Sequence, residues 1–353
     1  MPVTASTSNT SSSWWRRPGL DLDAFLGSAH ARLDTALFDV DGVLIDTRRS
    51  YRLAVIHAAE HVVRVVNGLR EAPSPLVSLE DVALFKLAGG FNNDWDATQL
   101  FAALWTARLR EWRGAPEAEV SLAEWASRAR AAALAGHGGP EWVRAVVPAS
   151  AIPSAEVARW AHDEHYWGAE LVRAHYAHEP IYAPDARGFV HNEEALLEAG
   201  LLPALAELGM RKLGLITGRV GPEVGWAVTF LNEAIAQPAG IAFRDTQFGH
   251  SPFASVVPGT VFAKPDPRAL ELAVRTLESR GALYVGDTAD DLDLVLRYRH
   301  EAQPADPRLP PVLAVAVAEG AAATAYQERG ADIVIPRVGE LPAALVALGV
   351  QAE

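Results

Sequence analysis

The chain contains no cysteine, and this absence excludes disulfide bonds, thiolate nucleophiles and zinc sites with cysteine ligands. Basic residues are also few, because 31 Lys and Arg oppose 44 Asp and Glu. The net charge of −13 argues against a surface that binds nucleic acid. No segment is apolar for long enough to cross a bilayer. What remains is a chain of 353 residues, half of them hydrophobic, which is enough material for two domains.

The first residues are rich in Ser, Thr and Asn and lack the apolar core of a secretory signal. We therefore expect residues 1–19 to form a disordered tail and the protein to be cytoplasmic. Trp14 and Trp15 interrupt this composition. We expect them to pack on the body of the protein.

Two aspartates stand two positions apart at the end of an apolar run. Residues 35–38 predict a buried strand, and Asp39 and Asp41 follow it. Because side chains alternate between the two faces of a strand, both carboxylates would share one face. Neighbouring carboxylates repel each other unless a cation lies between them or one is protonated, so the pair indicates a reactive site. An Asp-Gly turn is the structural alternative.

Further polar residues follow apolar segments in the second half of the chain. Thr217 and Gly218 follow one predicted strand, and Asp287 and Asp291 follow another. Between them, Lys264 lies among prolines that would present its ammonium group from a fixed loop. Ligands of open parallel α/β sheets bind at the carboxyl ends of the strands, so we expect these groups to meet there.

In order and in character, these four segments resemble the signature of the haloacid dehalogenase-like (HAD) superfamily, whose members are mostly phosphoryl-transfer enzymes. A lone Asp-x-Asp-Gly would be a weak signal, but four motifs in the right order are specific. The resemblance implies a doubly wound parallel α/β sheet. The motif residues, in chain order, are Asp39 and Asp41, Thr217, Lys264, and Asp287 with Asp291.

The resemblance also implies a role for each catalytic residue. Asp39 would attack phosphorus and form an aspartyl-phosphate, while Asp41 would act first as acid and then as base. Thr217, Gly218 and Lys264 would bind the phosphoryl oxygens, where charge must be stabilised. Taken alone, Thr217 could equally be a helix cap, and Lys264 a solvated loop residue.

A metal site is implied as well. Asp39, the backbone carbonyl of Asp41, and Asp287 would hold the ion. Asp291 would complete the site, or orient the waters of the ion or Lys264. Because oxygen-only ligands suit Mg²⁺, this is the expected cofactor.

Far more chain separates the first two motifs than one strand and helix require. Residues 47–187 have helical spacing in the stretches 52–66, 100–113, 122–134 and 156–172. This resembles the all-helical cap that subfamily IA inserts after its first motif, a domain that covers the site and selects the leaving group. The α/β core would then comprise residues 20–46 and 188–353.

A loop of this cap, residues 85–96, combines glycines with amides, acids and a tryptophan. It resembles a feature of one branch of subfamily IA phosphatases. Asn92, Asn93 and Asp94 would recognise hydroxyls of the leaving group, and Lys86 a second anionic group. The alternative is a structural loop in which Asn93 or Asp94 caps a helix and Trp95 packs beneath it.

Four cap histidines, His162, His165, His175 and His178, are close in sequence. They lack the spacing of a zinc-binding helix, which has two histidines four positions apart. We therefore expect them to have structural or solvated roles.

After the cap, strands and helices are expected to alternate, which specifies a parallel sheet covered on both faces. Expected helices include residues 193–208 and 222–236, and expected strands include residues 212–217, 283–286, 312–317 and 332–335. The chain should thus be a Mg²⁺-dependent phosphatase for a small organic phosphate monoester, with neither nucleic acid nor membrane as partner. The alternatives are a phosphomutase acting on a sugar phosphate and a binding or regulatory protein. The sequence does not predict the oligomeric state.

Overall fold

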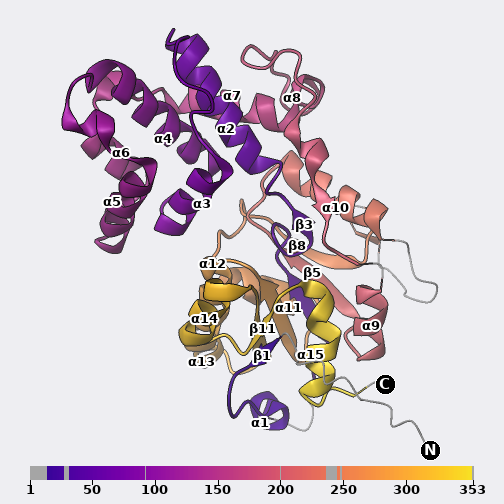
Figure 1. Ribbon diagram of the computed structural model, residues 1–353. Coiled ribbons are helices and arrows are strands. Elements are labelled where there is room, and N and C mark those ends of the chain that lie inside the picture. The colour runs from indigo at the N-terminus through magenta and orange to yellow at the C-terminus, as the bar shows by residue number, and fades with distance from the viewer. Residues whose placement is uncertain are drawn as a thin grey trace, which may run out of the picture. The chain divides into compact units, whose positions relative to one another are not determined.

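The computed structural model describes residues 14–27, 32–91, 93–198, 200–235, 245–246 and 249–351. The chain forms two compact units, Met1–Asp46 with Glu194–Glu353, and Thr47–Glu193. In Figure 1 the first unit contains the sheet, and the second is built from helices.

A sheet of seven strands, counted over the described residues, forms the centre of the first unit (Figure 1). Its strand order is β1-β11-β10-β9-β2-β5-β8. Neighbouring strands are parallel except for β1, which pairs antiparallel with β11. The strands are β1 (Trp15–Arg16), β2 (Thr35–Phe38), β5 (Lys212–Ile216), β8 (Phe253–Val257), β9 (Ala282–Gly286), β10 (Val312–Val317) and β11 (Ile333–Ile335). Two short antiparallel pairs are β3 (Ile45–Asp46) with β4 (Glu194–Ala195), and β6 (Asp245–Thr246) with β7 (Gly249–His250).

Consecutive residues of a strand point to opposite faces of the sheet. Both faces of this sheet carry apolar side chains, and helices cover both. Phe38 belongs to a core cluster with residues of α9, α10 and α15, whereas Leu37 belongs to a cluster with residues of α11 and α12. The expected doubly wound α/β fold is therefore confirmed. The helices of this unit are α1 (Leu22–Leu26), α9 (Leu201–Glu207), α10 (Pro222–Ala234), α11 (Arg268–Thr276), α12 (Ala289–Arg297), α13 (Gln303–Ala305), α14 (Gly320–Arg329) and α15 (Leu341–Ala347).

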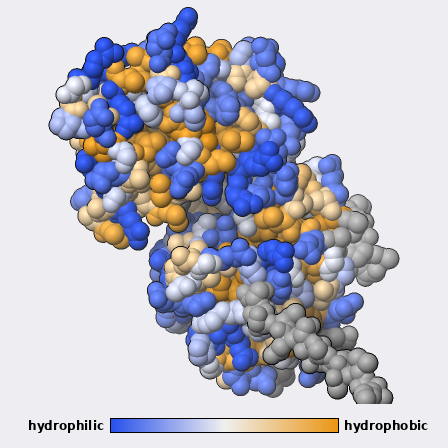
Figure 2. All heavy atoms as spheres, viewed as in Figure 1, coloured by the Kyte–Doolittle hydropathy of each residue, from blue (hydrophilic) through white to orange (hydrophobic). Residues whose placement is uncertain are grey.

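The helical unit has a core of its own, in which aromatic side chains such as Phe85, Phe101 and Trp125 are buried. Some large hydrophobic side chains stay exposed, such as Leu87 of α3 and Leu134 of α5, and apolar and hydrophilic residues are mixed on the face seen in Figure 2. The helices of this unit are α2 (Tyr51–His61), α3 (Leu79–Ala88), α4 (Asp94–Thr106), α5 (Leu122–Leu134), α6 (Pro140–Val146), α7 (Ala155–Trp167) and α8 (Ala169–Tyr176). A π-helical turn extends α2 over Val62–Val66, and another extends α4 over Ala107–Glu111.

The structure differs from the expected disordered tail at residues 14–19. Trp15 and Arg16 form the edge strand β1, and Trp14 packs against the core. Arg17 is ion-paired with the buried Asp332 at 3.0 Å. Residues 1–13 lie outside the described residues.

The structure also corrects the expected end of the cap and the helix expected at residues 193–208. The helical unit ends at Glu193, because the Tyr166 hydroxyl donates a 2.9 Å hydrogen bond to the Glu193 carboxylate and Phe189 packs on His57. The next two residues form β4, and the helix α9 begins only at Leu201. Strand β8 was not expected at all.

Gly168 breaks the helix expected over residues 156–172 into α7 and α8. Its φ angle is +79°, and an added Cβ would lie 2.2 Å from the backbone oxygen of Arg187. Gly188 packs equally closely on Trp167. The break therefore brings two backbone segments together at a distance that only glycine permits.

We predict that Gly168→Ala destabilises the protein by about 3 kcal/mol, since a positive φ costs about 1 kcal/mol and overpacking adds about 2 kcal/mol. Gly136→Ala is the matched control in the same unit, because its φ is +81° and no atom lies within 4 Å of the added Cβ. It should cost only about 1 kcal/mol. Urea unfolding followed by tryptophan fluorescence measures both, and equal costs would contradict the steric explanation.

Candidate active site

The motif residues follow three adjacent strands of the sheet. Asp39 follows β2, Thr217 follows β5 and Asp287 follows β9, and β2 lies between the other two. All three strands are parallel, so their carboxyl ends meet at one edge. The expected convergence of these side chains is therefore built into the strand order.

A buried lysine connects two of the aspartates. Lys264 Nζ lies 2.8 Å from Asp39 Oδ2 and 2.7 Å from Asp291 Oδ1. The exposed fractions of the three side chains are 11%, 5% and 2%. A buried charge needs partners of opposite charge. Burial alone would lower the pKa of Lys264, but Asp291 and Asp39 hold it above its usual value. Lys264 is thus a fixed cation within the site.

The Asp291 carboxylate accepts several hydrogen bonds within the site. Oδ1 accepts a hydrogen bond from the Tyr284 hydroxyl at 2.6 Å, in addition to its contact with Lys264. Oδ2 accepts from the backbone N–H and the hydroxyl of Thr288, which form a capping box at the start of α12. Burial alone would raise the pKa of Asp291, but Lys264 and these donors hold it below its usual value. Both oxygens are therefore already occupied.

Asp287 lacks such support. Its Oδ1 is buried and has no hydrogen-bond partner among the described residues. Burial, and then the charge of Asp291, raise the pKa of Asp287 to about 7. An added Cβ on Gly42 would lie 2.0 Å from Asp287 Oδ2, so the glycine after Asp41 is needed for the carboxylate to sit here. The Tyr326 hydroxyl holds the backbone carbonyl of Asp287 at 2.7 Å.

These carboxylates form the one group of potential metal ligands found among the described residues. One oxygen each from Asp39, Asp287 and Asp291 lie within 4.8 Å of one another. Burial, and then the charges of Asp291 and Asp287, raise the pKa of Asp39 well above its usual value, although Lys264 opposes this. Three crowded acids and an unpartnered buried oxygen fit a hard divalent cation.

Asp41 contacts a residue to which the sequence analysis gave no role. The Nε and Nη2 atoms of Arg219 lie 3.0 and 2.8 Å from Asp41 Oδ1. Arg219 is only 2% exposed. Its place directly after Thr217 and Gly218, at the end of β5, is the sequence signal that could have identified it.

Thr217 is buried, and its Oγ1 accepts a 3.1 Å hydrogen bond from the Arg219 backbone N–H. It is not the N-cap of the next helix, because α10 begins at Pro222 and Gly221 occupies the cap position. Gly218 is exposed. An added Cβ on Gly259 would lie 2.7 Å from its backbone oxygen, so the two loops are in close contact.

The cap residues expected to bind the leaving group belong to the helical unit. Asn93 caps α4 by accepting from the N–H groups of Trp95 and Asp96 at 2.8 and 3.3 Å. Lys86 is ion-paired with Asp94 at 2.9 Å. Asn92 lies outside the described residues. The Asn93 cap is the one that the structural alternative named, and a role of these residues in substrate binding stays a prediction.

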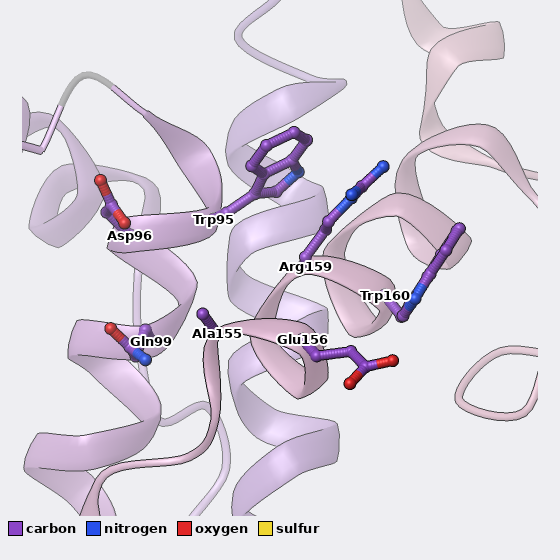
Figure 3. Close-up of a pocket in the computed structure, with 7 residues that line it drawn as sticks. All are labelled: Trp95, Asp96, Gln99, Ala155, Glu156, Arg159 and Trp160. Atoms are coloured by element: carbon purple, nitrogen blue, oxygen red, sulfur yellow. The ribbon is translucent and has the colours of Figure 1, made fainter.

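The same unit has a surface groove of about 380 Å³, lined by Trp95, Asp96, Gln99, Ala155, Glu156, Arg159 and Trp160 (Figure 3). The Arg159 guanidinium lies over the rings of Trp95 and Trp160, at 4.9 and 5.0 Å from their centroids. The groove contains none of the motif residues.

The contacts of the cap histidines are with their neighbours. His178 stacks on Trp160 at 3.7 Å and contacts Glu164 at 3.0 Å. His162 lies beside Asp163 at 3.2 Å, and His175 packs on Trp167. These contacts are of the structural kind that was expected.

The family model of the haloacid dehalogenase-like hydrolases matches residues 33–294. The chain therefore belongs to this family of hydrolases, as its motifs indicated. No curated protein matches its sequence. Among the described residues, no helix is long and apolar enough to cross a membrane.

Three solved structures illustrate what the chain is similar to. Phosphatase Tt82 from Thermococcus thioreducens is 26% identical, with 75% of this chain and 88% of that chain covered and a TM-score of 0.48. A Northeast Structural Genomics Consortium target is 15% identical, with coverages of 90% and 99% and a TM-score of 0.54. A HAD family hydrolase from Deinococcus radiodurans, solved with phosphate and sodium, is 15% identical, with coverages of 91% and 98% and a TM-score of 0.42.

We predict that Tyr284→Phe destabilises the protein by about 2 kcal/mol, because Asp291 loses a hydrogen bond made to a buried charge. Tyr298→Phe is the matched control, since its hydroxyl donates to the neutral carbonyl of Pro310 at 2.9 Å. It should cost about 1 kcal/mol. Urea unfolding of both variants checks the difference, and a Tyr298→Phe cost equal to or above that of Tyr284→Phe would contradict it.

Proposed function

We propose that this hydrolase is a Mg²⁺-dependent phosphatase that acts on a small organic phosphate monoester. The observation that carries the proposal is the fixed position of Lys264 between Asp39 and Asp291, beside the unpartnered oxygen of Asp287. This arrangement offers a nucleophile, a cation and a place for a metal ion within one buried cluster.

Asp39 would be the nucleophile. Its Oδ1 accepts a 2.7 Å hydrogen bond from the Val40 N–H, and its Oδ2 contacts Lys264, so the orientation of the carboxylate is fixed. A carboxylate oxygen attacks phosphorus, the bond from phosphorus to the ester oxygen breaks, and Asp41 donates its proton to the departing oxygen. Water then attacks the aspartyl-phosphate while Asp41 takes its proton, and inorganic phosphate and free Asp39 result.

Lys264, together with the Thr217 hydroxyl and the Gly218 loop, would bind the phosphoryl oxygens. The ammonium group is close to the nucleophile, so it opposes the repulsion between Asp39 and the incoming phosphate. Asp291 acts through Lys264, because its two oxygens are taken by Lys264, Tyr284 and Thr288. It would therefore position the lysine rather than touch the substrate.

Asp39, Asp287 and the backbone carbonyl of Asp41 would hold the Mg²⁺ ion. When bound, the ion supplies positive charge that lets a dianionic phosphate approach the carboxylates. The buried, unpartnered Oδ1 of Asp287 supports this assignment. The proposal gives Asp291 one of the alternative roles named for it, the orientation of Lys264.

The central test is turnover of a panel of phosphate monoesters by Asp39→Asn. We expect kcat to fall by at least about a thousandfold, since the nucleophile is removed. Asp293→Asn is the control, because this aspartate pairs with Arg329 on the surface outside the site. Release of inorganic phosphate measures the reaction. An Asp39→Asn enzyme as active as the wild type would overturn the proposal, as would the transfer of phosphate between positions of a sugar, which is mutase chemistry.

A second prediction concerns Mg²⁺ and pH. In the metal-free protein the pKa of Asp287 is raised to about 7, so the folded state holds a proton that the unfolded state loses near pH 4. Stability from this group therefore falls as pH rises from about 4 to 7 and stays low above that. Mg²⁺ would replace the proton and restore stability.

We expect Mg²⁺ to raise the melting temperature more at pH 8 than at pH 5.5, because at pH 5.5 the proton competes with the ion. Thermal unfolding with and without Mg²⁺ measures this. Asp287→Asn should lose most of the Mg²⁺ effect at both pH values, whereas Asp293→Asn should retain it. A shift independent of pH would show that Asp287 is not a ligand.

A further inference from the structure

The proposed reaction gives no role to Arg219, although its guanidinium contacts the acid-base residue directly. The side chain of Arg219 is 1% exposed and that of Asp41 is 30% exposed. The carboxylate therefore lies on the solvent side of the pair and shields the guanidinium. A guanidinium buried so completely needs anionic or polar partners for its N–H groups.

The backbone of Arg219 is fixed. Its N–H donates to Thr217 Oγ1 at 3.1 Å, and its carbonyl accepts from the Gly259 N–H at 3.2 Å. Asp41 is more exposed and is followed by Gly42, whose φ is +78°. If one member of the pair turns during the reaction, it is the carboxylate rather than the guanidinium.

The site places the leaving group beside this arginine. The departing oxygen must come within hydrogen-bond reach of Asp41, about 2.6–3.2 Å. Two nitrogens of Arg219 already lie 3.0 and 2.8 Å from that carboxylate. A substituent one or two bonds beyond the ester oxygen comes within reach of the guanidinium when it extends toward Arg219. When Asp41 turns toward the ester oxygen, two hydrogen bonds of the guanidinium become available to that substituent.

From this juxtaposition we infer that the substrate is a phosphate monoester with a second anionic group next to the ester-bearing carbon, and that Arg219 binds this group. A carboxylate or a second phosphate fits the planar fork of a guanidinium. An ammonium group at the same place is repelled. The inference rests on the proposed phosphatase function and adds the class of leaving group to it.

The test uses four esters that differ in the group next to the ester carbon: the phosphate esters of ethanol, ethanolamine, glycolate and 2-hydroxyethyl phosphate. For the wild type we expect kcat/KM for the glycolate ester, the bisphosphate or both to exceed that for ethyl phosphate by at least about tenfold. The ethanolamine ester should be the poorest. Preference for the carboxylate or for the second phosphate identifies which anion is recognised.

Arg219→Gln should lower the ratio of kcat/KM for the anionic ester to that for the neutral ester by about tenfold, while Arg219→Lys should lower it less, because a point charge lacks the fork. Comparing ratios removes the difference in leaving-group chemistry between the esters. Arg337→Gln is the control, since Arg337 pairs with Glu340 on the surface and its variant should keep the wild-type ratio.

Three results would overturn the inference. Equal kcat/KM for neutral and anionic esters in the wild type excludes the second anion, and this outcome does not depend on whether a variant folds. A uniform loss over all esters in Arg219→Gln and Arg219→Lys means that Arg219 only positions Asp41. A wild type that hydrolyses no phosphate ester overturns the proposed function itself and this inference with it.

Discussion

The contact of Lys264 with Asp39 and Asp291 is the interaction on which the site depends. Three carboxylates, at the ends of β2 and β9 and in the first turn of α12, each have an oxygen within 4.8 Å of the others, and one ammonium group cannot neutralise them. Burial, and then the charges of the neighbouring carboxylates, raise the pKa values of Asp39 and Asp287. Crowded carboxylates repel each other, and a divalent cation would offset this repulsion.

Close backbone approaches make this crowding feasible. Gly42 leaves room for Asp287, and Gly286 leaves room for Asp291, whose Cβ would lie 2.2 Å from a Cβ added at position 286. The capping box of α12 uses the same Asp291 carboxylate that orients Lys264. The Asp291 side chain therefore both caps α12 and pairs with Lys264, so a substitution of Asp291 removes both interactions.

The sequence predicted the residues whose position follows from strand order. Asp39, Thr217 and Asp287 follow adjacent strands of one parallel sheet, and that depends only on local apolar runs and on the alternation of elements. The Asp41–Arg219 contact and the division of a helix at Gly168 were not predicted, because each depends on a side chain or backbone distant in sequence. The edge strand β1 was missed for the same reason, since two residues gain strand geometry only from pairing with β11.

The position of the helical insertion also follows from the first motif. The turn after Asp41 is closed by hydrogen bonds between Gly42 and Ile45 and between Ile45 and Val40. Ile45 and Asp46 then pair with Ala195 and Glu194, the residues to which the chain returns. The chain leaves and re-enters the α/β unit at residues that pair with each other, so the two ends of the insertion are held together by β3 and β4. The entropy cost of closing a loop rises only slowly with its length, so a long insertion here costs little. The strand that leads to the insertion is thus hydrogen-bonded to the turn that carries Asp41.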